Sequence, residues 1–256
     1  MNAGPASDRV TVGFGAPHRH FRRTDSTNER AKDLALAGAA AGLVVTADEQ
    51  TAGRGRRGND WFAPPGSCLL YSALLRPYSA GDVPLLPLAI PVAVCEAAEA
   101  VAPVRCRVKW PNDVWVEERK VAGALVEARP EEGWAVIGVG INIAIPQDEF
   151  PPELRETADS LLPMEAEDGV PPGGAPGVRR ALVELNDSLA RWVSAGDDEV
   201  LSAFRARDAI SGRRISWDGG EGLAEQIDEL GHLVVQNPDG ERVSLGAGEV
   251  HLALGD

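Results

Sequence analysis

The stretch VKWPNDVWVEERKVAGALVEARPEEGWAVIGVGINI, residues 108–143, carries the clearest information about the fold. Apolar segments alternate in it with the turns PND and RPEEG, and a charged break lies around Glu118. Apolar runs joined by such short turns are typical of antiparallel hairpins, since parallel strands need a longer crossover. The stretch therefore predicts a strand that ends near Lys109, a hairpin around Glu118 and a further strand over residues 133–145.

Helical patterns lie on both sides of these strands. Ser26 followed by Glu29 has the spacing of a capping box and predicts a helix that ends at Gly42. Strands joined by tight turns and accompanied by helices indicate an α+β fold with a mixed, mainly antiparallel sheet. Further helices are predicted from the apolar patterning of residues 85–101, 151–162, 178–196 and 198–210.

The chain changes character after Gly212, where short apolar runs follow one another. Asp239-Gly240, between two of these runs, is a typical hairpin turn. Several short strands in so few residues indicate a small β-barrel rather than a large sheet. We therefore expect two domains, residues 1–207 and residues 208–256.

Composition argues against several classes of protein. A net charge of −14 and a pI of about 4.8 oppose binding to nucleic acid or to an anionic membrane, except through a local basic patch. The three cysteines form no C-x-x-C pair and the four histidines show no ligand spacing, so we expect no disulfide and no protein-held metal. The first 20 residues lack the pattern of a signal peptide, and prolines break the apolar region 83–102. We expect a cytoplasmic protein.

Residues 53–58, GRGRRG, match the pattern G-x-G-x-x-G. A dinucleotide-binding loop of this pattern opens a helix, but NDWFAPPG follows here and its prolines exclude one. The Walker pattern is also absent, since no Lys-Ser or Lys-Thr follows the glycines. Two interpretations remain. The loop either binds carboxylate or phosphate oxygens through its arginines, or it is a solvated loop whose arginines balance nearby acids.

Two polar residues interrupt apolar strands. Lys109 lies between Val108 and Trp110, where its point charge suits a carboxylate and a phosphate held together. Asn142 ends an apolar strand and is able to hydrogen-bond a ribose or a phosphate. Each residue has a plain alternative, namely a surface lysine in a turn and an asparagine at a strand end.

Taken together, these motifs resemble those of biotin protein ligases of the single-function type, without a DNA-binding domain. DSTNERA, EQTAGRGRRGNDW, VKWPNDVWVEERKVAGALVE, GVGINI and ETADSL occur in the family's order and approximate spacing. The resemblance is strong over residues 20–162, whereas the C-terminal part is similar only in length and β-character. It implies a catalytic domain like that of class II aminoacyl-tRNA synthetases and an SH3-like C-terminal barrel. Lipoate ligases of the wider superfamily carry different core motifs.

The resemblance implies an ATP-dependent ligase that attaches biotin to one lysine of a biotin carboxyl carrier domain. Biotin's carboxylate would attack the α-phosphate of ATP and give biotinyl-5′-AMP and pyrophosphate. The acceptor lysine would then attack this mixed anhydride and release AMP. Mg²⁺ is expected with ATP as a charge neutraliser. The glycine-rich loop is expected to order over the adenylate and keep water from it.

By resemblance, Lys109 and Arg56 are the catalytic cations, and Lys109 touches both the biotin carboxyl and the α-phosphate. Trp61 is expected to pack on the adenine, and Asn142 to face the nucleotide phosphates. Lys120 and Gly123 are expected to line the active site or dock the acceptor. Expected to bind biotin are Ser26, Thr27, Asn28, Gln50, Gly53, Arg54, Gly55, Arg56, Lys109 and Gly123. Expected to bind ATP are Arg54, Arg56, Arg57, Trp61, Lys109, Lys120 and Asn142.

One position departs from the family pattern. Many relatives carry a further basic residue shortly before the tryptophan, where this chain has Asn59-Asp60. The change removes positive charge near the expected triphosphate and predicts modestly weaker ATP binding. It gives no reason to infer an inactive protein.

Three alternatives and one open role remain at this point. Only about 20 residues precede the first ligase motif, too few for a DNA-binding domain, so we expect no DNA partner. The second alternative is a non-catalytic protein that only binds a small molecule, and the intact Lys109 and arginine loop speak against it. The third is a ligase for lipoate or another acyl acid, and competition between biotin and lipoate would show which acid the protein uses. The C-terminal barrel either caps the catalytic domain or takes part in handling ATP or the acceptor. Nothing marks a dimer face, so we expect a monomer or a weak homodimer.

Overall fold

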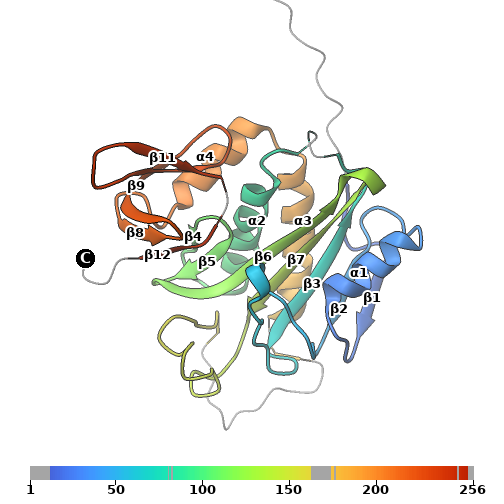
Figure 1. Ribbon diagram of the computed structural model, residues 1–256. Coiled ribbons are helices and arrows are strands. Elements are labelled where there is room, and N and C mark those ends of the chain that lie inside the picture. Colours follow the sequence, from blue (N-terminus) through green and yellow to red (C-terminus); the bar gives the residue numbers. More distant parts are fainter. Residues whose placement is uncertain are drawn as a thin grey trace, which may run out of the picture.

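A computed structural model describes residues 12–79, 81, 83–162, 174–175, 177–246 and 248–252. A seven-stranded sheet forms the centre of the larger part of the molecule (Figure 1). Its strands lie in the order β1-β2-β3-β7-β6-β5-β4, and every neighbouring pair is antiparallel except β1 and β2. They are β1 (His18–Phe21), β2 (Val44–Ala47), β3 (Cys68–Leu75), β4 (Arg107–Lys109), β5 (Asp113–Val116), β6 (Arg119–Arg129) and β7 (Trp134–Asn142). The predicted mixed, mainly antiparallel sheet is confirmed.

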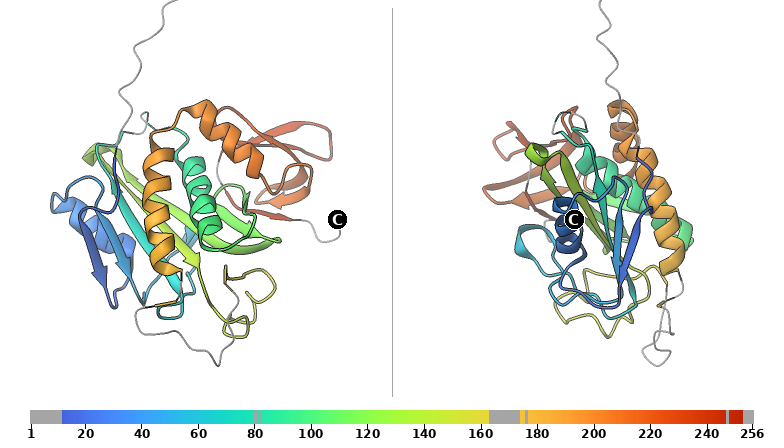
Figure 2. Two further views of the ribbon diagram at one scale, coloured as in Figure 1. Left: turned by 180° about the vertical axis from the view of Figure 1, so that it is seen from behind. Right: turned by 90° about the vertical axis from the view of Figure 1, so that its right-hand side faces the viewer.

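Helices cover the two faces of this sheet unequally. α2 and α3 pack on one face, whereas α1 lies on the other face beside β2 and β3 (Figures 1 and 2). Successive side chains of β3 point to opposite faces of the sheet, and both faces are packed. Ala73 and Leu75 face α2, while Leu74 packs against α1. Much of the α1 side of β6 and β7 is thereby left for a pocket. The helices are α1 (Thr27–Leu36), α2 (Leu86–Val101), α3 (Val178–Val193) and α4 (Asp197–Arg207), with 3₁₀ turns η1 (Arg56–Gly58) and η2 (Pro130–Glu132).

A second, five-stranded antiparallel sheet follows α4. Its order is β11-β10-β9-β8-β12, so β11 and β12 are the edges and the described strands form an open sheet. The hairpin turn predicted at Asp239-Gly240 is present, with Gly240 at φ 84°. The strands are β8 (Arg214–Trp217), β9 (Gly220–Ile227), β10 (Leu233–Gln236), β11 (Arg242–Leu245) and β12 (Val250–Leu252).

The two sheets share one apolar core. Ile215 and Val250 of the smaller sheet belong to the same buried cluster as the residues of α2, β6 and β7. The indole of Trp110 donates a hydrogen bond to the carbonyl of Gly231 at 3.0 Å. The amide of Ala209 donates to the carbonyl of Val108 at 2.9 Å, which extends the edge of the larger sheet beyond β4. The end of β4, and with it Lys109, is therefore held from both sides.

The helix predicted over residues 151–162 is wrong. The segment forms turns and then runs beside β6, where the amide of Lys120 donates to Thr157 O at 2.8 Å. The amide of Asp159 donates in return to Lys120 O at 3.0 Å. Backbone groups that pair with a neighbouring strand are not available for helical hydrogen bonds, so the segment cannot be helical there.

The predicted start and end of the first helix also need correction. Ser26 precedes α1, but its side chain makes no capping hydrogen bond. The helix ends at Leu36, well before Gly42. β1 was not predicted, because its sequence HRHF lacks the apolar alternation of a half-buried strand. None of the helices in the described part of the chain is long and apolar enough to cross a membrane.

Candidate active site

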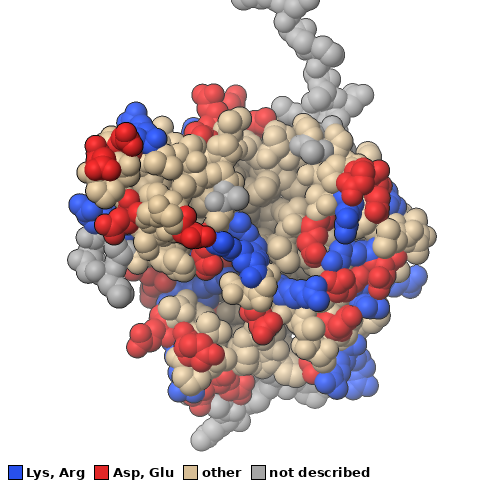
Figure 3. Space-filling model, viewed as in Figure 1, with Lys and Arg blue, Asp and Glu red and all other residues tan. Residues whose placement is uncertain are grey.

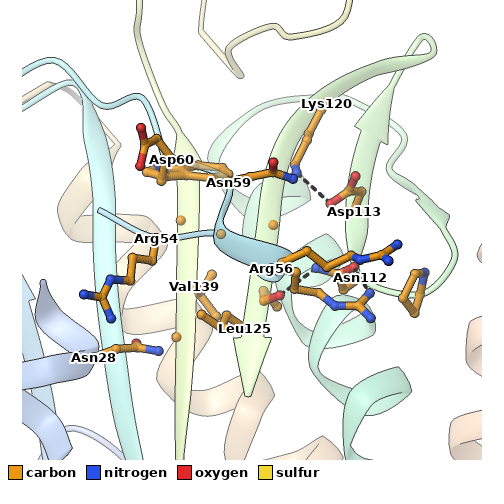
Figure 4. Close-up of a pocket in the computed structure, with 18 of the residues that line it drawn as sticks. Asn28, Arg54, Arg56, Asn59, Asp60, Asn112, Asp113, Lys120, Leu125 and Val139 are labelled. Atoms are coloured by element: carbon orange, nitrogen blue, oxygen red, sulfur yellow. Dashed lines mark hydrogen bonds and ion pairs between the residues drawn. The ribbon is translucent and has the colours of Figure 1, made fainter. Parts of the chain in front are cut away.

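A cavity of about 110 Å³ lies on the α1 side of the sheet (Figure 4). On this face of the molecule, Lys and Arg side chains gather around a hollow (Figure 3). The start of α1, the loop of residues 54–61, the middle of β6 and β7 and the turn after β4 surround it. Residues 248–250 of the C-terminal sheet complete the wall. Most of the site residues predicted from the sequence line this one cavity, namely Ser26, Thr27, Asn28, Gln50, Arg54, Gly55, Arg56, Arg57, Trp61, Lys109, Lys120 and Gly123.

Two predicted site residues lie outside this lining. Gly53 sits behind it, where an added Cβ would lie 3.0 Å from Gln50 Nε2 and 3.1 Å from the carbonyl oxygen of Trp61. Asn142 is buried and its amide nitrogen donates to the carbonyl of Asp159 at 3.0 Å. It faces a neighbouring cavity of about 480 Å³. The role of Asn142 toward nucleotide phosphates therefore stays a prediction.

One end of the cavity is a buried network of neutral polar groups, which we call the polar end. The amide and the hydroxyl of Thr27 donate to Gln50 Oε1 at 2.7 and 3.0 Å. The hydroxyl of Ser72 lies 2.8 Å from Thr27 Oγ1 and 2.5 Å from Asn28 Oδ1. These partners fix the side chains before any ligand binds, which lowers the entropy cost of recognising one.

Charged residues anchor the polar end from behind. The amide nitrogen of Asn28 donates to Glu127 Oε2 at 2.8 Å, and Lys32 pairs with Glu127 at 2.8 Å and with Glu29 at 2.9 Å. Gly138 is required at this end, because an added Cβ would collide with the side chain of Asn28. The orientation of Asn28 is thus set by β6 and β7 together.

The opposite side of the cavity, the cationic end, holds two basic residues that have no carboxylate partner among the residues that the structure describes. Arg56 Nη1 donates to the neutral Asn112 Oδ1 at 2.8 Å, and Asn112 is itself fixed by a 2.7 Å bond to Ala124 O (Figure 4). Lys109 Nζ lies 5.4 Å from the ring centre of Trp115. Neither cation forms an ion pair within the described ranges, so both charges are available to an anion.

Burial affects both of these cations. It lowers the pKa of the Lys109 ammonium, while the carboxylates of Asp113 and Glu249 oppose the change and Lys120 adds to it. Burial also lowers the pKa of the Arg56 guanidinium. Partly desolvated charges without a counter-ion attract an anion more strongly than solvated ones, because the local dielectric constant is lower.

The other predicted cations are already paired. Arg54 Nη1 lies 3.0 Å from Glu29 Oε1, and its side chain points toward Asn28 (Figure 4). Lys120 Nζ lies 2.7 Å from Asp113 Oδ1. Arg57 lies 3.7 Å from Asp218 of the C-terminal sheet, and both side chains are largely exposed. The structure thus separates five predicted cations into two with open charge and three with carboxylate partners.

The glycine- and arginine-rich loop folds into a small hairpin over the cavity. The amide of Gly55 donates to Asn59 O at 2.7 Å, and the amide of Trp61 donates to Gly53 O at 3.1 Å. Arg57 adopts a positive φ of 57° at the tip, inside η1. This tight turn directs Arg56 toward the turn after β4 (Figure 4).

Trp61 forms the border between the two cavities and lines both of them. Its indole packs on Gly123 and Gly140, where an added Cβ at Gly140 would collide with the ring. Lys120 Nζ lies 5.6 Å from the ring centre. The indole nitrogen is buried and makes no hydrogen bond to any described residue. An unpaired buried donor beside a cavity suits an acceptor on a ligand.

Sequence reasoning missed several residues of the site. Asn112 and Asp113 were part of the KWPND motif but were not assigned roles, although Asn112 holds Arg56 and Asp113 holds Lys120. Glu127 was missed because it looks like an ordinary charged residue in a strand. Glu249 lies in the C-terminal part, where no motif points to the cavity. Among the described residues no cluster of histidine, cysteine and carboxylate groups is suited to hold a metal.

Comparison with known sequences connects this geometry to a family. The model of the biotin/lipoate A/B protein ligase family matches residues 20–143. The bifunctional ligase/repressor BirA of Bacillus spizizenii is 39% identical over 150 residues, and the chain spans only 45% of that relative. The biotin–[acetyl-CoA-carboxylase] ligase of Mycobacterium tuberculosis is 34% identical over 257 residues, which cover 93% of this chain and 91% of the relative. The ligase of the same name from Paracoccus denitrificans is also 34% identical, with 86% and 95% covered.

Solved structures agree with the sequence comparison. A biotin protein ligase from Aquifex aeolicus in complex with biotin and ATP aligns with a TM-score of 0.72 at 26% identity, over 92% of this chain and 98% of that one. A biotin protein ligase from Leishmania major in complex with biotinyl-5-AMP aligns with a TM-score of 0.60 at 25% identity, over 90% and 98% of the two chains. The chain belongs to the biotin protein ligase family.

Proposed function

We propose that this protein joins biotin to one lysine of a biotin carboxyl carrier domain, in two steps that pass through biotinyl-5′-AMP. The observation that carries the proposal is the open charge of Lys109 and Arg56 at one end of a cavity whose other end consists of neutral polar groups. Two anions, a carboxylate and a phosphate, have to meet there in the first step. Their mutual repulsion is offset only by cations that are not already neutralised.

Biotin fits the cavity with its ureido ring at the polar end and its carboxylate at the cationic end. The ureido ring is neutral and carries both donors and acceptors, like the side chains of Thr27, Asn28 and Gln50. Leu125 and Val139 lie between the two ends and suit an apolar chain (Figure 4). A slot with a few fixed polar groups and an apolar middle is typical of sites for small ligands.

ATP would approach from the second cavity, with its base against Trp61. The unpaired indole nitrogen and the glycine floor at Gly123 and Gly140 leave a flat ring surface for a purine. Its α-phosphate would then reach Lys109, which lines both cavities. The hairpin of residues 53–61 would cover the adenylate and exclude water.

Mg²⁺ would accompany ATP and partly neutralise its phosphates. The carboxylate of Asp113 is bound to Lys120, and the described residues supply no metal-binding cluster of their own. The ion would therefore be held mainly through phosphate oxygens and water, as is usual for Mg²⁺ at nucleotide sites.

The proposal includes several further expectations. The unit of residues 1–207 would carry the chemistry, and residues 208–256 would form an SH3-like module. The acidic net charge and three buried free cysteines favour a cytoplasmic protein that binds no DNA. We expect a monomer or a weak homodimer.

Biotin-dependent exchange of pyrophosphate into ATP tests the first step, and the mass of a carrier domain after incubation tests the second. We expect exchange with biotin but not with lipoate, and a carrier domain heavier by one biotinyl group. Lys109→Ala is expected to lower the exchange rate about 100- to 1000-fold, as for other lost transition-state contacts. A well-folded wild-type protein without exchange would refute the proposal.

A further inference from the structure

A carboxylate from the C-terminal part of the chain lines the candidate active site. Glu249 directly precedes β12 and lines both the smaller and the larger cavity. Val250, its neighbour, is 1% exposed and pairs with Trp217 of β8, so the backbone at this point is firmly held. The place of Glu249 in the cavity wall is therefore set by the strand pairing of the residue next to it.

The charge of Glu249 is not committed elsewhere. It forms no ion pair with any described residue, but it lines the same cavity as Lys109 and Arg56, and its charge acts to raise the pKa of both. Two of the three other carboxylates that line the cavities are paired, since Asp113 is bound to Lys120 and Glu118 to Arg213 at 2.6 Å. Asp60 also lines both cavities, but it is exposed and lies away from Lys120 (Figure 4).

An open carboxylate beside Lys109 is poorly suited to the first step of the proposed reaction. That step brings the carboxylate of biotin and the phosphates of ATP together, and a third anion adds to their repulsion. The second step has the opposite requirement, because an acceptor lysine arrives as a cation beside Lys109 and Arg56. A carboxylate at this point offsets the repulsion between like charges.

We propose that Glu249 binds the ammonium group of the incoming acceptor lysine and so draws it to the adenylate. The ammonium then gives up a proton to solvent, and the neutral amine attacks the carbonyl carbon of the anhydride and displaces AMP. The larger cavity, of about 480 Å³, provides the approach, through the space that pyrophosphate would leave after the first step. Trp115, Phe62 and Leu252 line it, and such apolar walls suit the methylene chain of a lysine. This inference rests on the proposed function and assigns the C-terminal sheet a part in the second step.

The test is Glu249→Gln, which keeps the shape of the side chain and removes its charge. Biotin-dependent pyrophosphate exchange reports the first step, and single-turnover transfer from the enzyme-bound adenylate to a carrier domain reports the second. Hydroxylamine, which is uncharged at neutral pH, provides a nucleophile that needs no counter-charge. Glu221→Gln, an exposed glutamate of β9, is the matched control.

We expect Glu249→Gln to exchange pyrophosphate at least as fast as wild type, since one anion fewer opposes the first step, and to slow transfer to the carrier domain about tenfold or more. Cleavage by hydroxylamine should not slow, because this nucleophile needs no counter-charge. Glu221→Gln should change none of the three rates. Equal transfer rates in Glu249→Gln and wild type would overturn the inference, and so would an equal loss with hydroxylamine, which indicates a role in the adenylate site itself. Failure of the proposed function is distinct, because wild-type exchange would then be absent.

Discussion

The two ends of the candidate active site differ in how completely their polar groups are satisfied. At the polar end, Thr27, Asn28 and Gln50 are all hydrogen-bonded within the protein, and the charges behind them are paired. At the cationic end, Lys109 and Arg56 keep their charge without a carboxylate partner in the described chain. A hydrogen-bonded network holds its remaining donors and acceptors in place for a neutral polar group, whereas unpaired charge attracts an anion. The difference explains how one small cavity can orient a ligand with a neutral head and an acidic tail.

The largest effect should separate two arginines of the same loop. Arg56→Ala removes an uncompensated, half-buried charge, and we expect kcat/KM for exchange to fall about 10- to 100-fold. Arg54→Ala removes an exposed partner of Glu29, and we expect a loss of about threefold or less. Steady-state exchange kinetics of the two variants check this. Similar losses in both would mean that carboxylate pairing does not decide which cation binds substrate.

Two glycines of β7 should sharpen the same comparison. In Gly138→Ala the added methyl group collides with the side chain of Asn28, so we expect KM for biotin to rise about tenfold while KM for ATP stays close to wild type. In Gly140→Ala the added methyl group collides with the ring of Trp61, so we expect KM for ATP to rise about tenfold while KM for biotin stays close to wild type. Thermal unfolding of both variants controls for general destabilisation. If either variant changed the KM for biotin and the KM for ATP equally, the idea that biotin and ATP bind at separate parts of the site would be contradicted.

The smallest effect concerns pH. Burial lowers the pKa of Lys109, so its charge is lost at a lower pH than that of an ordinary lysine, and exchange should decline on the alkaline side. Asp113 stabilises the charged form, whereas Lys120 opposes it. Asp113→Asn should therefore move the alkaline limb of the pH–rate profile to lower pH, and Lys120→Gln should move it to higher pH. If the alkaline limbs of the two variants shifted in the same direction, a group other than Lys109 would control the pH–rate profile.

Local patterns predicted much of this molecule. The hairpins of residues 108–143 were predictable because their turns and apolar runs are adjacent in sequence. Lys109 was noticed because its charge interrupts an apolar strand, whereas Arg56 was singled out by the resemblance to biotin protein ligases. The helix expected over residues 151–162 failed because the segment pairs with Lys120, more than 30 residues earlier in the chain. No local pattern reports such a distant partner.

The sequence also could not show which of the cations would have a carboxylate partner. Arg54 and Arg56 look equivalent in GRGRRG, and only the fold places Glu29 beside one and Asn112 beside the other. Glu249 is separated from the remaining site residues by more than 100 positions, and its neighbours in sequence resemble an ordinary barrel strand. Residues recruited across two sheets become visible only when the sheets are assembled.

The central claim is that the cationic end selects a carboxylate, and one binding experiment tests it directly. Calorimetry would compare biotin with its neutral carboxamide on wild type and on Lys109→Ala. We expect wild type to prefer biotin, and the preference to shrink about tenfold or more in the variant, because the amide needs no counter-charge. Tight binding of both ligands to both proteins, with an unchanged ratio, would show that Lys109 does not select the anion and would contradict the account.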